Sequence, residues 1–126
     1  MNKPVNPPGY PVHPFYSQAV ESTAAQRMLF IAGQVGVGPD GIIPADITGQ
    51  TRNALNNLNA VLAAGGMTSS EIVKFTIFLT DAAHVDAFGA AAAASLPQPP
   101  PAATMIIVKG LAAPDMLVEI EAIAVQ

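Results

Sequence analysis

The sequence of 126 residues predicts an α+β fold in which two helices cover one face of a single sheet. Hydrophobic periodicity gives the element order strand, strand, helix, strand, helix, strand, strand. An apolar content of 51% is sufficient for a hydrophobic core, and the absence of cysteine excludes a disulfide framework and a thiolate metal site. We therefore expect one folded unit whose stability comes from packing alone.

The first elements are an N-terminal arm and two strands. Residues 1–14 hold five prolines, which lack amide donors and fix φ, so this segment is predicted to be an extended or irregular proline-rich arm on the surface. Residues 15–126 form the single predicted domain. Its first strands are expected at 15–20 and 27–37, joined by a polar turn.

The helices and the remaining strands follow from local signals. Asp46 is a good N-cap for a helix with apolar residues at helical spacing, and the two glycines that begin at Gly65 provide its end. Asp81 is predicted to cap a second helix that leads into an alanine run and ends before the prolines of 96–101. The other strands are expected at 71–80, 104–108 and 117–125.

The last predicted strand carries two carboxylates in an otherwise apolar run. Because side chains alternate along a strand, Glu119 and Glu121 share one face, and the apolar neighbours on both faces predict that both are covered. A charge on an apolar face is costly unless it is compensated. One interpretation is a structural pairing with Lys109, Arg27 or backbone amides. The other is a carboxylate that holds and polarises a water molecule.

Composition limits the classes of partner. Only 11% of the residues are charged, which predicts that part of the outer surface is buried against copies of the same chain. The net charge of −4, with scattered lysines and arginines, argues against nucleic-acid binding. No apolar run approaches the roughly 18 residues of a membrane span, and the first residues contain no hydrophobic signal region. We expect a homo-oligomer in the cytoplasm.

Five segments follow a known pattern in register from about residue 15 to the C-terminus. They are YSQAV at 16–20, FIAGQV at 30–35, the helical segment at 50–62, VKFTIFLTD at 73–81 and VEIEAIA at 118–124. Together they resemble the Rid (reactive intermediate deaminase) family, also known as YjgF and labelled endoribonuclease L-PSP. The resemblance implies a chorismate-mutase-like fold and a homotrimer whose sheets pack inside, with three ligand clefts between subunits.

The resemblance also implies a chemistry. Deaminating members hydrolyse imines or enamines such as 2-aminoacrylate and need neither a cofactor nor a metal. Their site uses an arginine to grip the substrate carboxylate, a glutamate to position water, and a tyrosine and a glycine in the cleft wall. The glutamate corresponds to Glu119, the predicted catalytic residue. The tyrosine and the glycine correspond to Tyr16 and Gly33.

The arginine of the family's site has no counterpart in this chain. The family's Pro-x-Arg-Ser/Thr motif reads Pro-Ala-Ala-Thr at 101–104, so that Ala103 replaces the carboxylate clamp. In the family, serine is common at the position of Ala32, and cysteine is common at the position of Met105. The chain therefore resembles the arginine-lacking subgroups, with a more apolar pocket and weak or absent turnover of ordinary 2-iminoacids. Losing such a pair removes roughly 2–5 kcal/mol of binding. The predicted ligand-binding residues are Tyr16, Ala32, Gly33, Ala103 and Met105.

Three functions remain open on the sequence. The first is an imine or enamine deaminase whose small-molecule ligand lies between subunits. The second is a non-catalytic trimeric module for ligand binding or interaction. The third is an endoribonuclease or translation inhibitor, for which the chain lacks a basic groove and for which neither His13 nor His84 has an acid–base partner in the sequence.

Overall fold

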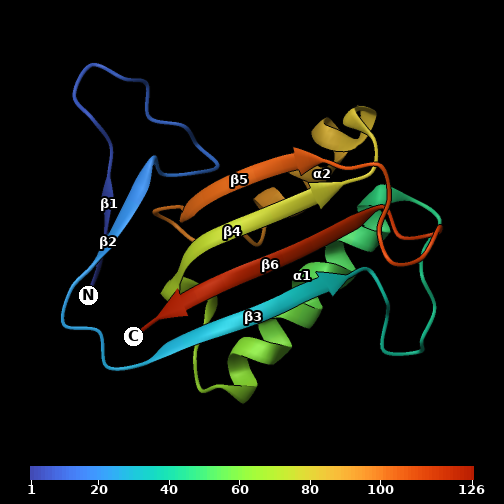
Figure 1. Cartoon of the computed structure of the whole chain (residues 1–126), viewed down its shortest axis with the longest axis horizontal. Helices are drawn as coiled ribbons and strands as arrows, with labels where there is room; N and C mark the ends of the chain where they lie inside the picture. The colour runs from blue at the N-terminus through green and yellow to red at the C-terminus, as the bar shows by residue number, and fades with distance from the viewer.

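The computed structural model describes all 126 residues and has the predicted α+β architecture, with two helices on one face of a mixed four-stranded sheet (Figure 1). The strand order is β3-β6-β4-β5. The C-terminal strand β6 is therefore central and antiparallel to both neighbours, whereas β4 and β5 run parallel. The strand bounds are Met28–Val35 for β3, Ile72–Leu79 for β4, Ala102–Ile107 for β5 and Val118–Val125 for β6.

Helix α1, Ile47–Ala64, begins and ends as predicted. The side chain of Asp46 accepts a hydrogen bond from the backbone N–H of Gly49 at 2.8 Å, and Gly65 is the C-cap. Its core face includes Leu58 and Leu62, which are almost completely buried against the sheet. Capping and periodicity are local signals, which explains why the sequence located this helix accurately.

Helix α2, Val85–Ala93, begins later than the sequence suggested. Asp81 does act as a cap, but it caps a short 3₁₀ turn, Ala82–His84, by accepting from the N–H of Ala83 at 2.9 Å. Phe88 carries the buried face of α2. Neither α1 nor α2 combines the length and the apolar character that crossing a bilayer requires.

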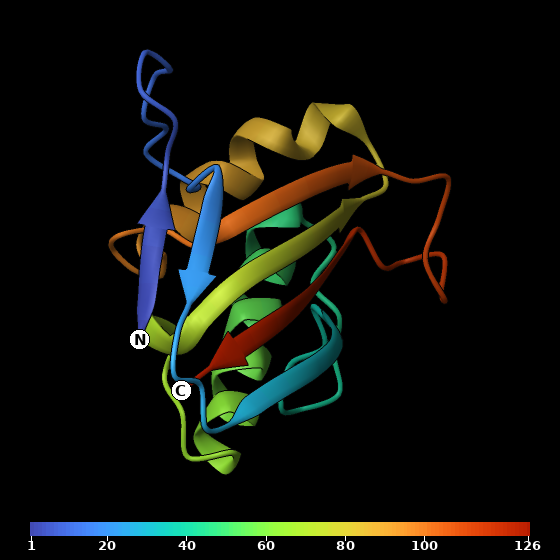
Figure 2. The same ribbon diagram turned by 60° about the vertical axis from the view of Figure 1, so that its left-hand side comes forward.

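The N-terminal segment is more regular than the sequence indicated. Strand β1, Asn2–Val5, lies within the predicted arm and pairs antiparallel with β2, Ala19–Ser22, to form a two-stranded ribbon beside the main sheet (Figure 2). The predicted strand at 15–20 is thus wrong for most of its length. Ser17 instead binds the chain ahead of β5, since its N–H donates to the carbonyl of Pro101 at 2.9 Å and its hydroxyl donates to that of Pro100.

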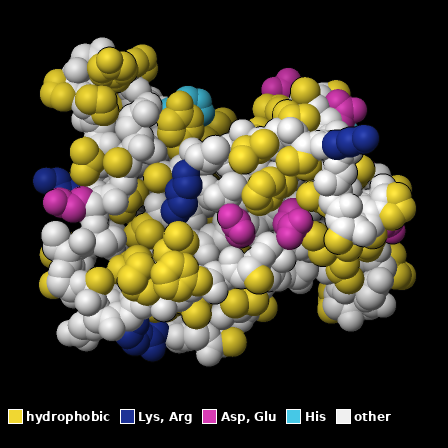
Figure 3. All heavy atoms as spheres, viewed as in Figure 1, with side chains coloured by type: hydrophobic (Ala, Val, Ile, Leu, Met, Phe, Trp, Pro, Cys, Tyr) yellow, Lys and Arg dark blue, Asp and Glu magenta, His cyan; other side chains and the backbone are white.

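The two faces of the four-stranded sheet differ in their covering. One face packs on the helices and buries alternate residues of β6, namely Val118, Ile120, Ala122 and Ala124. The other face, here called the open face, has no covering layer within the chain (Figure 3). Phe30 is 70% exposed and Met28 56% exposed on β3, where hydrophobic side chains gather in Figure 3. The sequence predicts that this second face is buried against another copy of the chain, and that burial stays a prediction.

A buried glutamine ties α1 to the start of β6. Gln50 is fully buried, and its amide nitrogen donates to the carbonyl oxygens of Pro44 and Asp115 at 2.7 and 2.8 Å. Its side-chain oxygen accepts the N–H of Leu117 at 2.8 Å. Three backbone groups from two separate loops are thereby satisfied by one side chain, which fixes where β6 begins relative to the helix.

We expect Gln50→Ala to lower the free energy of unfolding by about 3 kcal/mol, because each orphaned buried backbone group costs about 1–3 kcal/mol before local relaxation. Urea unfolding at fixed protein concentration measures this change. Asn59→Ala, on the exposed side of the same helix, is the matched control and should shift stability by only a few tenths of a kcal/mol. Equal midpoints for the two variants would contradict the assigned role of Gln50.

Candidate functional site

The largest cavity is a cleft between α2 and the edge strand β5, with a volume of about 680 Å³. Twelve of its 15 lining residues are hydrophobic and none is lysine or arginine, so its wall is apolar and without a cation. Three predicted site residues lie in it: Tyr16, Ala103 and Met105. It is called the α2–β5 cleft below.

Tyr16 reaches this cleft because its neighbour is anchored. Ser17 is buried, and its two hydrogen bonds to the carbonyls of Pro100 and Pro101 hold the N-terminal segment against the chain that enters β5. These bonds place Tyr16 beside Ala103 although 86 residues separate them in the sequence. The proline-rich loop before β5 supplies carbonyl acceptors that have no strand partner, which suits this docking.

His13 also lines the cleft, which the sequence did not suggest. Its ring stacks on Tyr16 with 4.3 Å between ring centroids and an interplanar angle of 21°. Its Nδ1 accepts a hydrogen bond from the N–H of Phe15 at 3.1 Å. This contact ties the ring of His13 to the segment that carries Tyr16.

Glu119 lies on the open face, against a β-bulge of β3. The pairing of β3 with β6 shifts register between Ile31 and Gln34, which leaves Ala32 and Gly33 as the irregular residues. A methyl group at Gly33 would overlap Oε1 of Glu119, so the half-buried carboxylate fills the space that this glycine leaves. The predicted pair of Gly33 and Glu119 is thus in direct contact.

Ala32 lines a second hollow, of about 410 Å³, on the open face. Lys74, Thr76 and the exposed Glu121 also line it. The amine of Lys74 donates to the hydroxyl of Thr104 at 2.6 Å.

The structural pairing considered for the two glutamates does not form with Arg27. Its guanidinium donates to the carbonyl of Gly65 at 2.7 Å, at the end of α1. Lys109 is exposed beyond the end of β5. Within one chain, the half-buried Glu119 packs against the bulge and forms no ion pair with Arg27 or Lys109.

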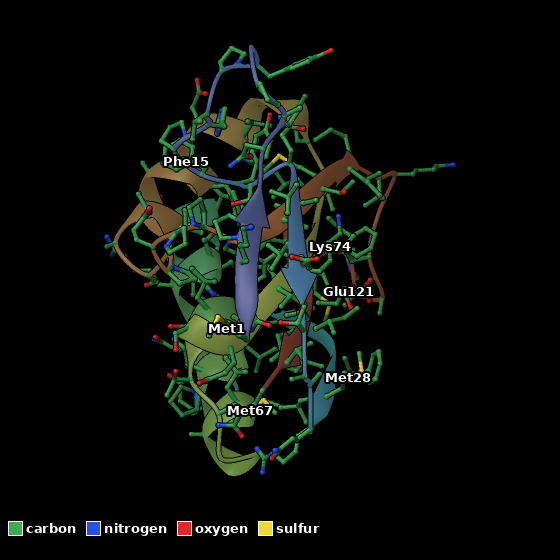
Figure 4. All side chains as sticks on the ribbon, turned by 90° about the vertical axis from the view of Figure 1, so that its left-hand side faces the viewer. Met1, Phe15, Met28, Met67, Lys74 and Glu121 are labelled. Carbon is green, nitrogen blue, oxygen red and sulfur yellow. The ribbon has the colours of Figure 1, made fainter.

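The predicted site residues fall into two groups on opposite faces of the sheet. Tyr16, Ala103 and Met105 are on the helix side at the β5 edge, whereas Ala32, Gly33 and Glu119 are on the open face near the β3 edge. Figure 4 shows this separation from the side, with Phe15 of the α2–β5 cleft toward the helices and with Lys74 and Glu121 on the other side. One chain alone does not bring the two groups together.

Two features of the site were not predicted from the sequence: the β-bulge at Gly33, and the positions of His13 and Asp86 in the cleft. The sequence does contain a signal for the bulge, because a glycine inside a strand pattern often marks one. The sequence contains no signal for the positions of His13 and Asp86, since both depend on how the N-terminal segment and α2 approach β5.

No group of three or more histidine, aspartate or glutamate side chains is arranged to hold a metal ion.

Comparison with known proteins adds independent information. The family model described as endoribonuclease L-PSP matches residues 10–126. RutC family protein PH0854 of Pyrococcus horikoshii is 37% identical over 116 residues, which cover 90% of this chain and 88% of the relative. TdcF of Escherichia coli, provisionally named a reactive intermediate deaminase, is 40% identical over 63 residues, 49% of each chain.

Solved structures agree with the sequence matches. YyfB of Yersinia pestis, a protein of the conserved Rid family, superposes with a TM-score of 0.86 at 34% identity and covers 99% of this chain and 98% of its own. Escherichia coli TdcF with bound serine gives a TM-score of 0.73 at 30% identity, covering 92% and 91%. The match spans nearly the whole chain in both sequence and structure, and this protein therefore belongs to the Rid (YjgF, endoribonuclease L-PSP) family.

Proposed function

We propose that copies of this chain associate so that the two groups of site residues meet, and that the completed cleft binds and hydrolyses a small imine or enamine. The observation that carries this proposal is the half-buried Glu119 carboxylate, fitted against Gly33 on the face opposite the cleft that holds Tyr16. A polar group held in place without a cationic partner is typical of a site that awaits a ligand or a water.

The geometry favours a cyclic assembly. The two groups lie near opposite edges of the sheet, β5 and β3, so that joining the first group of one copy to the second group of the next is a head-to-tail contact. Head-to-tail contacts close into rings when the rotation permits. The exposed apolar residues of the open face, Met28 and Phe30, supply a surface that such a contact would bury. Three copies is the number implied by the family resemblance.

The chemistry needs only a positioned water. Glu119 accepts a proton from water as its oxygen attacks the imine carbon, which gives a carbinolamine. The nitrogen takes this proton as the carbinolamine forms. Glu119 next accepts the proton of the new hydroxyl group and passes it to the nitrogen as the C–N bond breaks, so that ammonia and a carbonyl compound leave. This sequence of steps uses no cofactor. Members of the same family support the assignment, since TdcF is provisionally named a reactive intermediate deaminase.

The apolar cleft points away from 2-iminoacids as substrates. The solved TdcF holds serine, an amino acid that carries a carboxylate. In this chain, Ala103 occupies the wall where the family motif has arginine, and no lysine or arginine lines the α2–β5 cleft. We therefore propose an imine or enamine that lacks the carboxylate, acted on in the cytoplasm. RNA cleavage is disfavoured because this cleft offers no cationic side chain to a phosphate backbone.

Phe30→Asp should dissociate the assembly, because it places a charge in the apolar centre of the proposed contact. Sedimentation velocity is expected to give a trimer for the native chain and a smaller species for the variant. Ala60→Asp adds the same charge to the exposed side of α1, behind the sheet, and should leave the trimer intact. A native chain that sediments as a monomer would refute the intersubunit site.

Glu119→Gln should reduce imine hydrolysis by about 10²–10⁴-fold, the usual contribution of a general base, with little change in ligand affinity. The rate of imine loss can be followed after the imine is generated in situ by a flavin amine oxidase. Glu21→Gln, at an exposed position of β2 outside both hollows, is the control and should retain most activity. Unchanged rates in Glu119→Gln would leave a binding module as the better description.

Gly33→Ala tests the fitted position of the carboxylate separately from its charge. The new methyl group would displace Glu119, a flexible side chain, so we expect a rate loss close to that of Glu119→Gln and little effect on thermal stability. A crystal structure of the variant would reveal the displaced side chain. Full activity with the carboxylate moved would disconnect Glu119 from the chemistry.

Ala103→Arg should restore the missing clamp and raise the turnover of 2-iminopropionate, which we expect to be weak in the native chain. The energy of such a pair, about 2–5 kcal/mol, corresponds to at least a 30-fold gain in kcat/KM. Equal and high turnover by both proteins would show that the alanine does not limit this substrate.

A further inference from the structure

We propose that the α2–β5 cleft selects a ligand with an apolar body and a positively charged nitrogen, and that it rejects carboxylates. The inference deepens the proposed function, on which it rests for the location of the site. It concerns the sign of charge that the site prefers, and this preference follows from the ionised groups and the aromatic surfaces that face the cavity.

The first argument is the charge of the lining. Asp86, at the start of α2, is the one aspartate or glutamate in the wall, and no lysine or arginine faces it. The open face would add Glu119 from the other group of site residues, together with Glu121 and Lys74, which line the hollow beside Ala32. Two carboxylates against one amine, together with Asp86, leave the completed site negative. The chain as a whole also has a net charge of −4.

The second argument is the aromatic wall. Four of the seven phenylalanine and tyrosine residues of the chain line this one cleft. Aromatic faces carry negative electrostatic potential and attract cations, most strongly when water is excluded. An aromatic wall with one carboxylate is the arrangement by which proteins bind alkylated ammonium groups. The residues are Phe15, Tyr16, Phe75 and Phe88.

The third argument is the stack of His13 on Tyr16. The Nδ1 atom of His13 accepts the N–H of Phe15, which ties the ring to the segment that carries Tyr16. The stacked pair presents a flat surface at the rim of the cleft, which suits a planar ligand. A carboxylate placed there would lose its hydration and gain no lysine or arginine partner.

The charge preference fits the reaction. A protonated imine is a stronger electrophile than a neutral one, and a negative site favours the protonated form. Water attacks the iminium carbon and forms the C–O bond while Glu119 accepts the proton. That proton passes to the nitrogen. Glu119 then accepts the proton of the new hydroxyl group as the C–N bond breaks to release ammonia and the aldehyde or ketone, and this second proton converts ammonia to ammonium. The iminium ion and one water are consumed, and one carbonyl compound and one ammonium ion are formed.

Three stable molecules of one shape test the inference: benzamidinium is cationic, benzamide is neutral and benzoate is anionic. None is an imine substrate, so calorimetric titration of the native assembly measures binding without turnover. We expect benzamidinium to bind about tenfold more tightly than benzamide, because a desolvated cation over aromatic faces contributes on this scale. Benzoate should bind more weakly than benzamide.

Two variants assign the preference to the cleft. Asp86→Asn should weaken benzamidinium binding by about threefold, the scale of an exposed charge pair, and leave benzamide unchanged. Ala103→Arg should reverse the order, so that benzoate binds more tightly than benzamidinium. Asp40→Asn, in the turn after β3, removes the same charge outside the cleft and should change none of the three affinities.

Benzoate binding as tight as benzamidinium binding in the native protein would overturn the inference, and so would the absence of binding by all three molecules. The outcome is separable from that of the proposed function. Benzamidinium selectivity without any imine hydrolysis would remove the catalytic proposal and keep the charge preference. Imine hydrolysis with no selectivity among the three molecules would keep the catalytic proposal and remove the charge preference.

Discussion

The three hydrogen bonds of the buried Gln50 are the constraint on which the geometry of the candidate site depends. They fasten the first turn of α1 to the loop before β6 and so set where the central strand begins. The register of β6 against β3 then places Glu119 beside the bulge at Gly33. An apolar residue at position 50 would leave the loop carbonyls unsatisfied and β6 without this reference point.

Burial of only one sheet face connects this fold to its proposed activity. The helices pack against the apolar side chains that alternate along β6. The second face of the sheet carries the carboxylates and the exposed Phe30, and no layer of the same chain covers it. The same asymmetry places the two groups of site residues on opposite sides of the sheet. Under the proposed head-to-tail association, the contact that buries the open face would also complete the cleft.

Local signals were sufficient for part of the fold. The cap at Asp46, the stop at Gly65 and the helical periodicity between them are fixed by neighbouring residues, and the structure reproduces them. The strand expected at 15–20 was wrong because the partner of Ser17 lies more than 80 residues away, in the loop before β5. Pairing over such separations leaves no periodic mark in the sequence.

The sequence by itself determined the family, the α+β class, the helix α1 and the absence of arginine at position 103, since these depend on residue identity and on short-range periodicity. Only the tertiary structure decided that Gly33 makes room for Glu119, that His13 stacks on Tyr16 and that Asp86 faces the cleft. These neighbours are joined by packing between elements that are distant along the chain. Their contacts are set by strand register and helix placement, which no local pattern encodes.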